Sequence, residues 1–284
     1  MLVSKTSQTI EHLDGLKYEQ FHVSGKHGST TGHIIWYDQN LSHLNLVISK
    51  ASEALNPETA LNHTGAGGTL EQLIASQKDL RFIINGTFNH YRKHFYKWDH
   101  NNFNIGDPVG YVKIRNLIYE DIALNTLNGF LFLEGKSHWK IVGDKPTHSK
   151  YILGSRPVLI QDSKAIDISL SEFLNIEQHK ITPPSYLIHG PEAHARTAVG
   201  NKDDSLGFIV IEGDGANEQK GVTLHELQEF GMTAGFETLL NLDGGGSSRF
   251  WLKTEDNLTI QSSVPEEDKE RILGHTLMLF SSKL

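Results

Sequence analysis

The chain alternates short apolar runs with polar, glycine-containing segments, and most of the runs have the length of a β-strand. They are rich in Val, Ile, Leu, Phe and Tyr, which is the composition typical of strands. The runs cover residues 33–37, 44–48, 81–85, 109–114, 130–133, 158–160, 207–211, 238–242 and 276–280. The pattern predicts a fold built mainly from strands.

Helices are predicted where Ser or Thr stands three residues before Glu or Gln at the start of an apolar repeat, which is the capping-box pattern. The pairs are Thr69 with Gln72, Ser169 with Glu172 and Thr223 with Glu226. The last of these helices is expected to run to Gly235 and to pack the segment around Asn241 in place. Because Glu226 is explained as a capping partner, we do not assign it to catalysis.

Strands that outnumber helices, with occasional crossover helices between them, favour the α+β class. The prediction is one domain over residues 1–284, with mixed, strand-rich sheets and a few packing helices, and with residues 1–30 as a candidate peripheral N-terminal segment. No internal repeat of fixed period is present. Residues 51–68 and 175–191, which contain Pro and Gly, are predicted loops.

The segment N-L-D-G-G-G-S-S at 241–248 combines one acidic residue with three glycines and two hydroxyls between two apolar runs. It predicts a strand, a tight turn and a second strand, with Asp243 at the bend. Backbone N–H groups without Cβ atoms can converge on an anion, so the candidate binding residues are Gly244, Gly245, Gly246, Ser247 and Ser248. A plain hairpin turn that Asp243 caps, or a flexible connection, explains the same pattern.

Two further segments repeat this arrangement of a strand with polar groups. Residues 83–88 place Asn85, Gly86 and Thr87 at the end of an apolar strand, where sheets often bind ligands, although Asn-Gly is also the preferred pair of a type I′ hairpin turn. Arg196 and Thr197 lie in a small, apolar, strand-like segment. A guanidinium there can clamp a phosphate or carboxylate with two parallel donors, or form a structural ion pair.

Charge and composition exclude several classes of protein. The formal net charge of -8 and the lack of a Lys/Arg run argue against general nucleic-acid binding. The absence of cysteine excludes disulfides, thiolate nucleophiles and Cys-based zinc sites. No run approaches the ~20 apolar residues of a membrane span, and the first residues lack the apolar region of a signal peptide. We expect the chain as given to be cytoplasmic, virion-associated or exported without a leader.

The sixteen histidines include two pairs with spacings that a metal site could use, His90 with His94 and His189 with His194. Neither pair lies in an H-E-x-x-H helix, so dispersed surface or hydrogen-bonding histidines are the favoured interpretation and no metal site is assigned. A serine hydrolase is also not favoured, because the turn lacks the G-x-S-x-G pattern.

Taken together and in this order, the motifs resemble the phosphodiester glycosidase family. The stretches that carry the resemblance lie at 85–88, 195–200, 214–215, 221–227 and 241–248, with weaker matches at 107–110 and 153–165. The chain departs from the family pattern at Asn89, where a second aromatic is usual, and at Ala216, where an arginine often follows the D-G pair. These departures bear on the substrate more than on the type of reaction.

The resemblance implies hydrolysis of the sugar C1–O bond of a glycosyl phosphodiester or a related phosphorylated glycan. Asp243 would stabilise the oxocarbenium-like carbon or activate water, and Arg196 would hold the phosphate together with the turn, Thr197 and Ser247. Asn85, with Gly86 and Thr87, would fix sugar hydroxyls. Asp214 or Glu192 is the candidate second carboxylate.

His90, His189 and His194 are candidates for proton transfer near neutral pH. The implied partner is a small-molecule or glycan sugar phosphate; the oligomeric state is open. No cofactor is required by this chemistry, although a divalent cation is not ruled out by the sequence. Two alternatives stay open: a non-catalytic glycan- or phosphate-binding module, and a metal-dependent phosphodiesterase that cleaves P–O.

Overall fold

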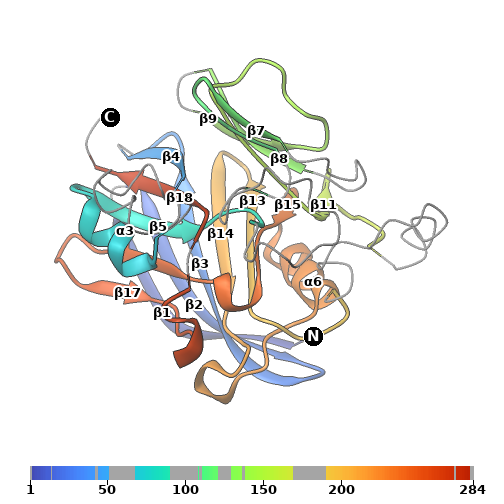
Figure 1. Cartoon of the computed structure of the whole chain (residues 1–284). Coiled ribbons are helices and arrows are strands. Elements are labelled where there is room, and N and C mark those ends of the chain that lie inside the picture. The colour runs from blue at the N-terminus through green and yellow to red at the C-terminus, as the bar shows by residue number, and fades with distance from the viewer. Residues whose placement is uncertain are drawn as a thin grey trace, which may run out of the picture.

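The structure is a computed structural model. It describes residues 2–13, 15–41, 44–50, 68–89, 108, 111–120, 129–135, 138–168, 190–271 and 273–281, and of residues 2–13, 49, 50 and 120 the backbone alone. Most of this part of the chain is β-strand, arranged in three sheets (Figure 1).

The largest sheet has eight strands, and each pair of neighbours is antiparallel. In spatial order they are β1 (Leu2–Leu13), β2 (Leu16–Gly25), β3 (Gly28–Asp38), β14 (Ser205–Ile211), β13 (Arg196–Lys202), β15 (Thr238–Asn241), β11 (Val158–Gln161) and β12 (Lys164–Ala165). Strands from both ends of the chain therefore lie side by side.

Two five-stranded sheets complete the fold, again with antiparallel neighbours. One contains β7 (Leu117–Glu120), β6 (Tyr111–Ile114), β10 (Tyr151–Ser155), β8 (Gly129–Glu134) and β9 (His138–Val142). The other contains β17 (Thr259–Gln261), β16 (Phe250–Lys253), β5 (Leu80–Asn85), β18 (His275–Phe280) and β4 (Asn45–Lys50).

Two α-helices occur in the described part of the chain, α3 (Leu70–Ser76) and α6 (Leu224–Ala234). Both begin with the predicted capping box, in which Thr69 or Thr223 accepts a backbone N–H and the Gln or Glu at the third position returns the bond. Gly235, at φ 82°, ends α6 as predicted. Short 3-10 turns are η1 (Ala216–Glu218), η2 (Gly245–Ser247) and η3 (Glu266–Asp268).

The sheets pack on one shared core, and each helix covers an outer face. In β14, Phe208 and Val210 face the main core, whereas Ile209 and Ile211 face a second cluster that includes Leu227 of α6. A third cluster lies between α3 and the sheet that contains β5. Because both faces of β14 are buried, its sequence is a continuous apolar run and not an alternating one.

The strand-rich prediction is confirmed: each of the nine apolar runs overlaps a strand. The expectation of mixed sheets is wrong for the described strands, since their neighbours are antiparallel. The predicted crossover helix is nevertheless present. Strands β14 and β15 flank β13 and are both antiparallel to it, so they run in the same direction, and α6 connects them. The helix predicted from Ser169 and most of both predicted loops lie outside the described residues.

Candidate functional site

The glycine segment 241–248 connects two different sheets. It leaves the eight-stranded sheet at β15 and enters the sheet of β5 at β16, so the hairpin interpretation is wrong. Leu242 N–H donates to Thr197 O at 2.9 Å, and Asp243 N–H donates to Gly86 O at 3.1 Å. These bonds place Asp243 at the junction between the two sheets.

Asn85 holds this junction together. Its Nδ2 donates to Asp243 O at 2.8 Å, and its Oδ1 accepts Thr197 Oγ1–H at 2.9 Å and Arg249 N–H at 3.1 Å. The structure therefore brings Asn85, Thr197 and Asp243 together from distant parts of the chain. Asn85 and Thr197 are 1% and 0% exposed, so they support the site from beneath, whereas the sequence suggested that they face a ligand.

The type I′ turn that Asn-Gly would suggest is absent at Asn85-Gly86. Neither residue is among those with positive φ, which both central positions of that turn require. Gly86 N–H instead donates to His275 O at 2.8 Å. A Cβ at Gly86 would lie 2.8 Å from that oxygen, which explains the glycine.

Asp243 carries a carboxylate that titrates close to neutral pH. Burial raises the pKa of Asp243 from 3.8 to about 6. Three smaller effects lower it: the hydrogen bond from the Ser247 hydroxyl, the positive charge of Arg271 and the hydrogen bond from Gly244 N–H. Gly244 N–H donates to Asp243 Oδ1 at 3.0 Å. A partly buried carboxyl with this pKa can act as a base or an acid in the physiological range.

The predicted anion cradle of glycine N–H groups is largely occupied by the chain itself. Besides Gly244, Gly245 N–H donates to Ala195 O at 2.8 Å, Ser247 N–H to Gly244 O at 3.2 Å and Ser248 N–H to Gly245 O at 2.9 Å. The glycines serve close packing instead: a Cβ at Gly246 would lie 2.3 Å from the Asp268 carboxylate. The turn is thus a compact support for Asp243.

A second polar cluster contains Asp214, His194 and Glu192. His194 Nδ1 lies 2.6 Å from Asp214 Oδ1, and its Nε2 lies 3.1 Å from Glu192 Oε2. The hydrogen bond to Asp214 is the main cause that raises the pKa of His194, and the bond to Glu192 and the charge of Asp214 raise it further. Burial and the charge of Arg196 lower this pKa but do not cancel the rise. An imidazolium held between two carboxylates is therefore favoured at this position.

The two clusters meet at Ala195 and Gly245. Asp214 lies in a turn with φ 55°, followed by Gly215 at φ 95°, and Ala216 N–H donates to Gly213 O at 3.0 Å. Asp214 Oδ2 accepts Ala195 N–H at 2.8 Å, and Ala195 O accepts Gly245 N–H at 2.8 Å. The side chains of His194 and Asp214 are 28% and 22% exposed, so a ligand can reach them.

Arg196 is held by two backbone carbonyl groups. Its Nε donates to Val222 O at 3.0 Å and its Nη2 to Glu192 O at 2.8 Å, and the residue is 5% exposed. Burial lowers its pKa to about 10, while the charges of Asp214 and Glu192 raise it. These bonds fix the backbone that carries Glu192 and His194, which is a positioning role.

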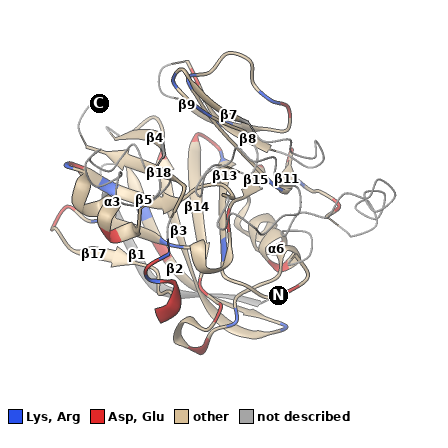
Figure 2. Cartoon of the chain, viewed as in Figure 1, with Lys and Arg blue, Asp and Glu red and all other residues tan. Residues whose placement is uncertain are grey.

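Sequence reasoning missed Asp268 and Arg271. Arg271 Nη1 donates to Asp268 Oδ1 at 3.1 Å, and both side chains are partly buried beside the glycine turn. They belong to the charged run 266–271, whose first turn is η3, visible as an acidic turn in Figure 2. Such a run is typical of a solvated surface, so no signal in the sequence separated these residues from their neighbours.

Two buried hydroxyls at the site are unsatisfied within the described part of the chain, Thr87 Oγ1 and Ser248 Oγ. The residues are 1% and 3% exposed. Because they are as fully buried as Asn85 and Thr197, these hydroxyls do not face a ligand in this arrangement, whereas the sequence suggested that both residues bind one.

His90, His94 and His189 lie outside the described residues. Among the residues that are described, no three His, Asp or Glu side chains are grouped to hold a metal ion. Within the same residues, no helix has the length and apolar character to cross a membrane.

A hollow of about 610 Å³ lies next to the second cluster. Its lining includes Pro191, which precedes Glu192, and Thr223, which follows Val222. Lys26 and His27, at the tip of the β2–β3 hairpin, line it together with Glu226 and Glu229, and Lys26 N–H donates to Glu226 Oε1 at 2.8 Å. The hollow can therefore hold a group bound beside this cluster.

The packed antiparallel sheets bring carboxylates and an imidazole together around a turn at their junction, and these are groups that acid–base chemistry uses. The family model described as phosphodiester glycosidase matches residues 79–280. The match covers most of the chain, and the chain belongs to the phosphodiester glycosidase family.

The curated relatives include the human and mouse enzymes named N-acetylglucosamine-1-phosphodiester alpha-N-acetylglucosaminidase. The human enzyme is 41% identical over 139 residues, and the mouse enzyme is 31% identical over 146 residues. Each alignment covers 49% of this chain and 23% of the relative, so the matched region spans about a quarter of their length.

Solved structures share the fold. The zebrafish N-acetylglucosamine-1-phosphodiester alpha-N-acetylglucosaminidase catalytic domain has a TM-score of 0.60 at 15% identity and covers 98% of this chain and 87% of its own. A hypothetical protein from Synechocystis has a TM-score of 0.61 at 10% identity, covering 98% and 64%. At these identities the similarity supports the fold alone.

Proposed function

We propose that this chain hydrolyses a glycosyl phosphodiester by cleaving the bond between C1 of the sugar and the phosphate oxygen. The observation that carries the proposal is the meeting of Asp243 and the Glu192–His194–Asp214 cluster at Ala195 and Gly245. Membership in the phosphodiester glycosidase family supports the same reaction.

Asp243 acts on the sugar side of the bond. Above a pH of about 6 it is ionised, and it then stabilises the positive charge that develops at C1 or removes a proton from the attacking water. The pKa near 6 makes it a useful base at neutral pH, because a carboxylate with an ordinary pKa holds a proton more weakly.

His194 and Arg271 act on the phosphate side. Protonated His194 keeps its Nδ1–H on Asp214, and its Nε2–H donates to the leaving phosphate once the exposed Glu192 carboxylate moves aside. The positive charge of Arg271 stabilises the same group. A phosphate diester is already an anionic and good leaving group, so positive charge matters more here than a strong acid.

Asn85, Thr197 and Arg196 hold the reacting residues in place from beneath. Thr87 and Ser248, whose hydroxyls are also buried, belong to the same supporting layer. The hollow near Lys26 and His27 accommodates the group on the far side of the phosphate.

The sugar is first sought among N-acetylglucosamine derivatives, the class named for the human and mouse relatives. Purified protein is offered a panel of glycosyl phosphodiesters that differ in the sugar and in the second ester group, with and without EDTA. We expect release of free sugar from at least one compound, unaffected by EDTA, since no step requires a metal.

The matched variants are Asp243→Asn and Asp256→Asn, the latter on the exposed turn between β16 and β17. Loss of turnover in Asp243→Asn, with turnover kept in Asp256→Asn, supports the role assigned to Asp243. Turnover that EDTA abolishes would favour a metal-dependent phosphodiesterase. Binding of the panel compounds with no turnover at all would favour a non-catalytic module and reject the enzyme.

A further inference from the structure

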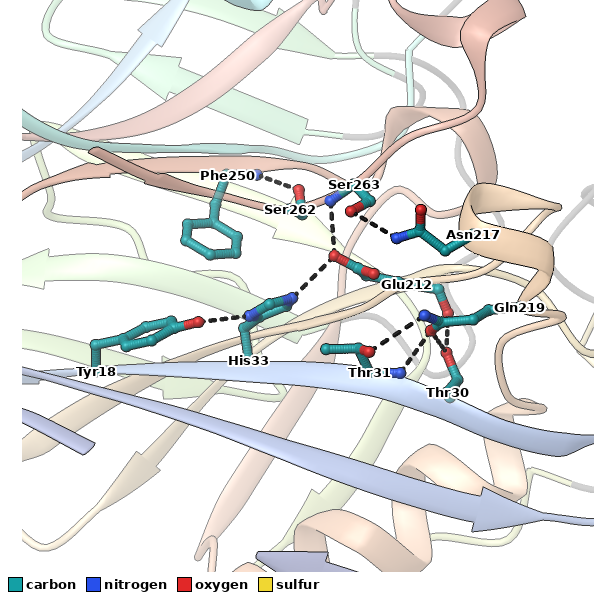
Figure 3. A network of polar contacts seen from close by, with 10 residues as sticks. All are labelled: Tyr18, Thr30, Thr31, His33, Glu212, Asn217, Gln219, Phe250, Ser262 and Ser263. Carbon is teal, nitrogen blue, oxygen red and sulfur yellow. Dashed lines mark hydrogen bonds and ion pairs between the residues drawn. The ribbon is translucent and has the colours of Figure 1, made fainter. Parts of the chain in front are cut away.

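A row of buried polar side chains crosses the core beneath the site (Figure 3). The Tyr18 hydroxyl lies 3.0 Å from His33 Nδ1, and His33 Nε2 lies 3.1 Å from Glu212 Oε1. The three residues are 1%, 3% and 4% exposed, so none of them contacts a substrate. Glu212 ends this row and stands two residues before Asp214.

Glu212 fixes the base of the loop that carries Asp214. Its N–H donates to Thr31 O at 2.9 Å, and its carbonyl accepts Thr30 Oγ1–H at 2.6 Å. At the other end of the loop, Gln219 Oε1 accepts Thr31 N–H at 2.5 Å. The loop 213–218 is thus anchored at both ends to Thr30 and Thr31 of β3, as Figure 3 shows.

Glu212 also reaches the loop on the other side of the glycine turn. Ser263 N–H donates to Glu212 Oε1 at 2.6 Å, and Asn217 Nδ2 donates to Ser263 Oγ at 2.9 Å. The chain continues from Ser263 into η3 and then to Arg271. One carboxylate therefore connects the Asp214 loop with the Asp268–Arg271 loop.

The donors in this row have defined directions. A backbone N–H can only donate, so Glu212 Oε1 is an acceptor for Ser263, and His33 Nε2–H donates to the same oxygen. In the tautomer with the ring proton on Nε2, His33 Nδ1 accepts the Tyr18 hydroxyl proton. Hydrogen bonds to a carboxylate are stronger than bonds between neutral groups, so Glu212 holds His33 and the backbone of Ser263 firmly.

We propose that Glu212 is a positioning residue of this active site, which fixes the Asp214 loop and the Asp268–Arg271 loop in one arrangement around the glycine turn. It acts through Asp214 on His194 and through Ser263 on Arg271. The effect on turnover rests on the proposed function, but the effect on His194 does not.

Glu212→Gln preserves the shape of the side chain and removes its charge. The matched control is Ser262→Ala, which deletes the buried bond from Phe250 N–H, 3.1 Å long, in the same region without touching Glu212. Both variants are expected to unfold at temperatures a few degrees lower. The pKa of His194, which Asp214, Glu192 and Arg196 face, is followed by NMR and assigned with His194→Gln.

In Glu212→Gln we expect the pKa of His194 to fall toward its ordinary value by about half a unit or more, because the Asp214 bond loosens. We expect kcat to fall about tenfold or more with little change in KM, since misplaced catalytic groups affect the rate more than binding. Ser262→Ala should leave both unchanged. If Glu212→Gln does not fold, His33→Gln is measured in its place, and the same fall in the pKa of His194 and in kcat is expected.

An unchanged His194 pKa in the folded variant, or an equal change in Ser262→Ala, overturns the positioning role. Because this titration needs no substrate, a failure of the inference is distinguishable from a failure of the proposed function, which the turnover of the unaltered protein tests.

Discussion

His194 Nδ1 and Asp214 Oδ1 lie 2.6 Å apart, and the second oxygen of the same carboxylate accepts the Ala195 N–H at 2.8 Å. Ala195 in turn accepts the N–H of Gly245. The proton state of His194 and the position of the glycine turn are therefore coupled through one carboxylate. This arrangement leads to predictions about charge, pH and stability.

The pH dependence of kcat/KM should be bell-shaped. Asp243 must be ionised, so the rate falls as the pH drops below its pKa of about 6. His194 must be protonated, so the rate falls again above its pKa, which is raised from 6.5. Initial rates between pH 4.5 and 9 test this. A profile that rises without a maximum would remove His194 from the reaction.

Asp214→Asn should lower the pKa of His194, because the bond to Asp214 is the main cause of its elevation. The alkaline limb of the pH profile then moves to lower pH, and kcat at pH 7.5 falls by about 10²-fold. Glu192→Gln is the matched control, and its effect on both quantities should be smaller. Equal effects of the two variants would contradict the conclusion that Asp214 affects the pKa of His194 more than Glu192 does.

Asp243→Asn should stabilise the fold at neutral pH while abolishing turnover. The folded pKa of about 6 lies above the ordinary 3.8, so the folded protein loses stability as the pH rises from about 4 to about 6. At pH 7 the buried charge costs up to about 3 kcal/mol, which Asn removes. Urea unfolding should show this gain at pH 7 and little difference below pH 4. A less stable variant at pH 7 would show that the charge is well solvated.

Asn85→Ala should destabilise the protein by about 2–4 kcal/mol, because the buried Thr197 hydroxyl and Arg249 N–H lose their acceptor. Turnover should fall as well, since Asn85 Nδ2 holds Asp243 O. Asn40→Ala, at an exposed turn, is the control and should stay within about 0.5 kcal/mol. A loss below 1 kcal/mol in urea unfolding would mean that Asn85 is not the joint of the two sheets.

The sequence predicted the strands and two helices well because their signals are local. Apolar runs and capping boxes depend on neighbours within a few residues, and α6 (Leu224–Ala234) lies between the expected caps Thr223 and Gly235. Polar residues at strand ends, Asn85 and Asp243, and Thr197 within a strand-like segment indicate a site, and the structure brings the three together. Their roles at the reaction stay predictions until variants are measured.

Other features depend on pairing between distant strands and could not be predicted. Whether the glycine segment returns on its own sheet or crosses to another is decided by the partners of β15 and β16, which local patterns do not contain. The bonds of Arg196 to carbonyl groups and the approach of Arg271 to Asp243 are likewise long-range. A charged run gives no signal about which of its members turns inward.

The most direct test of the account is hydrolysis of an accepted glycosyl phosphodiester in ¹⁸O-labelled water, followed by mass spectrometry of both products. Attack at C1 predicts that the label enters the sugar and that the released phosphate monoester contains none. Label in the phosphate, with unlabelled sugar, would mean P–O cleavage and would contradict the role of Asp243 at the anomeric carbon.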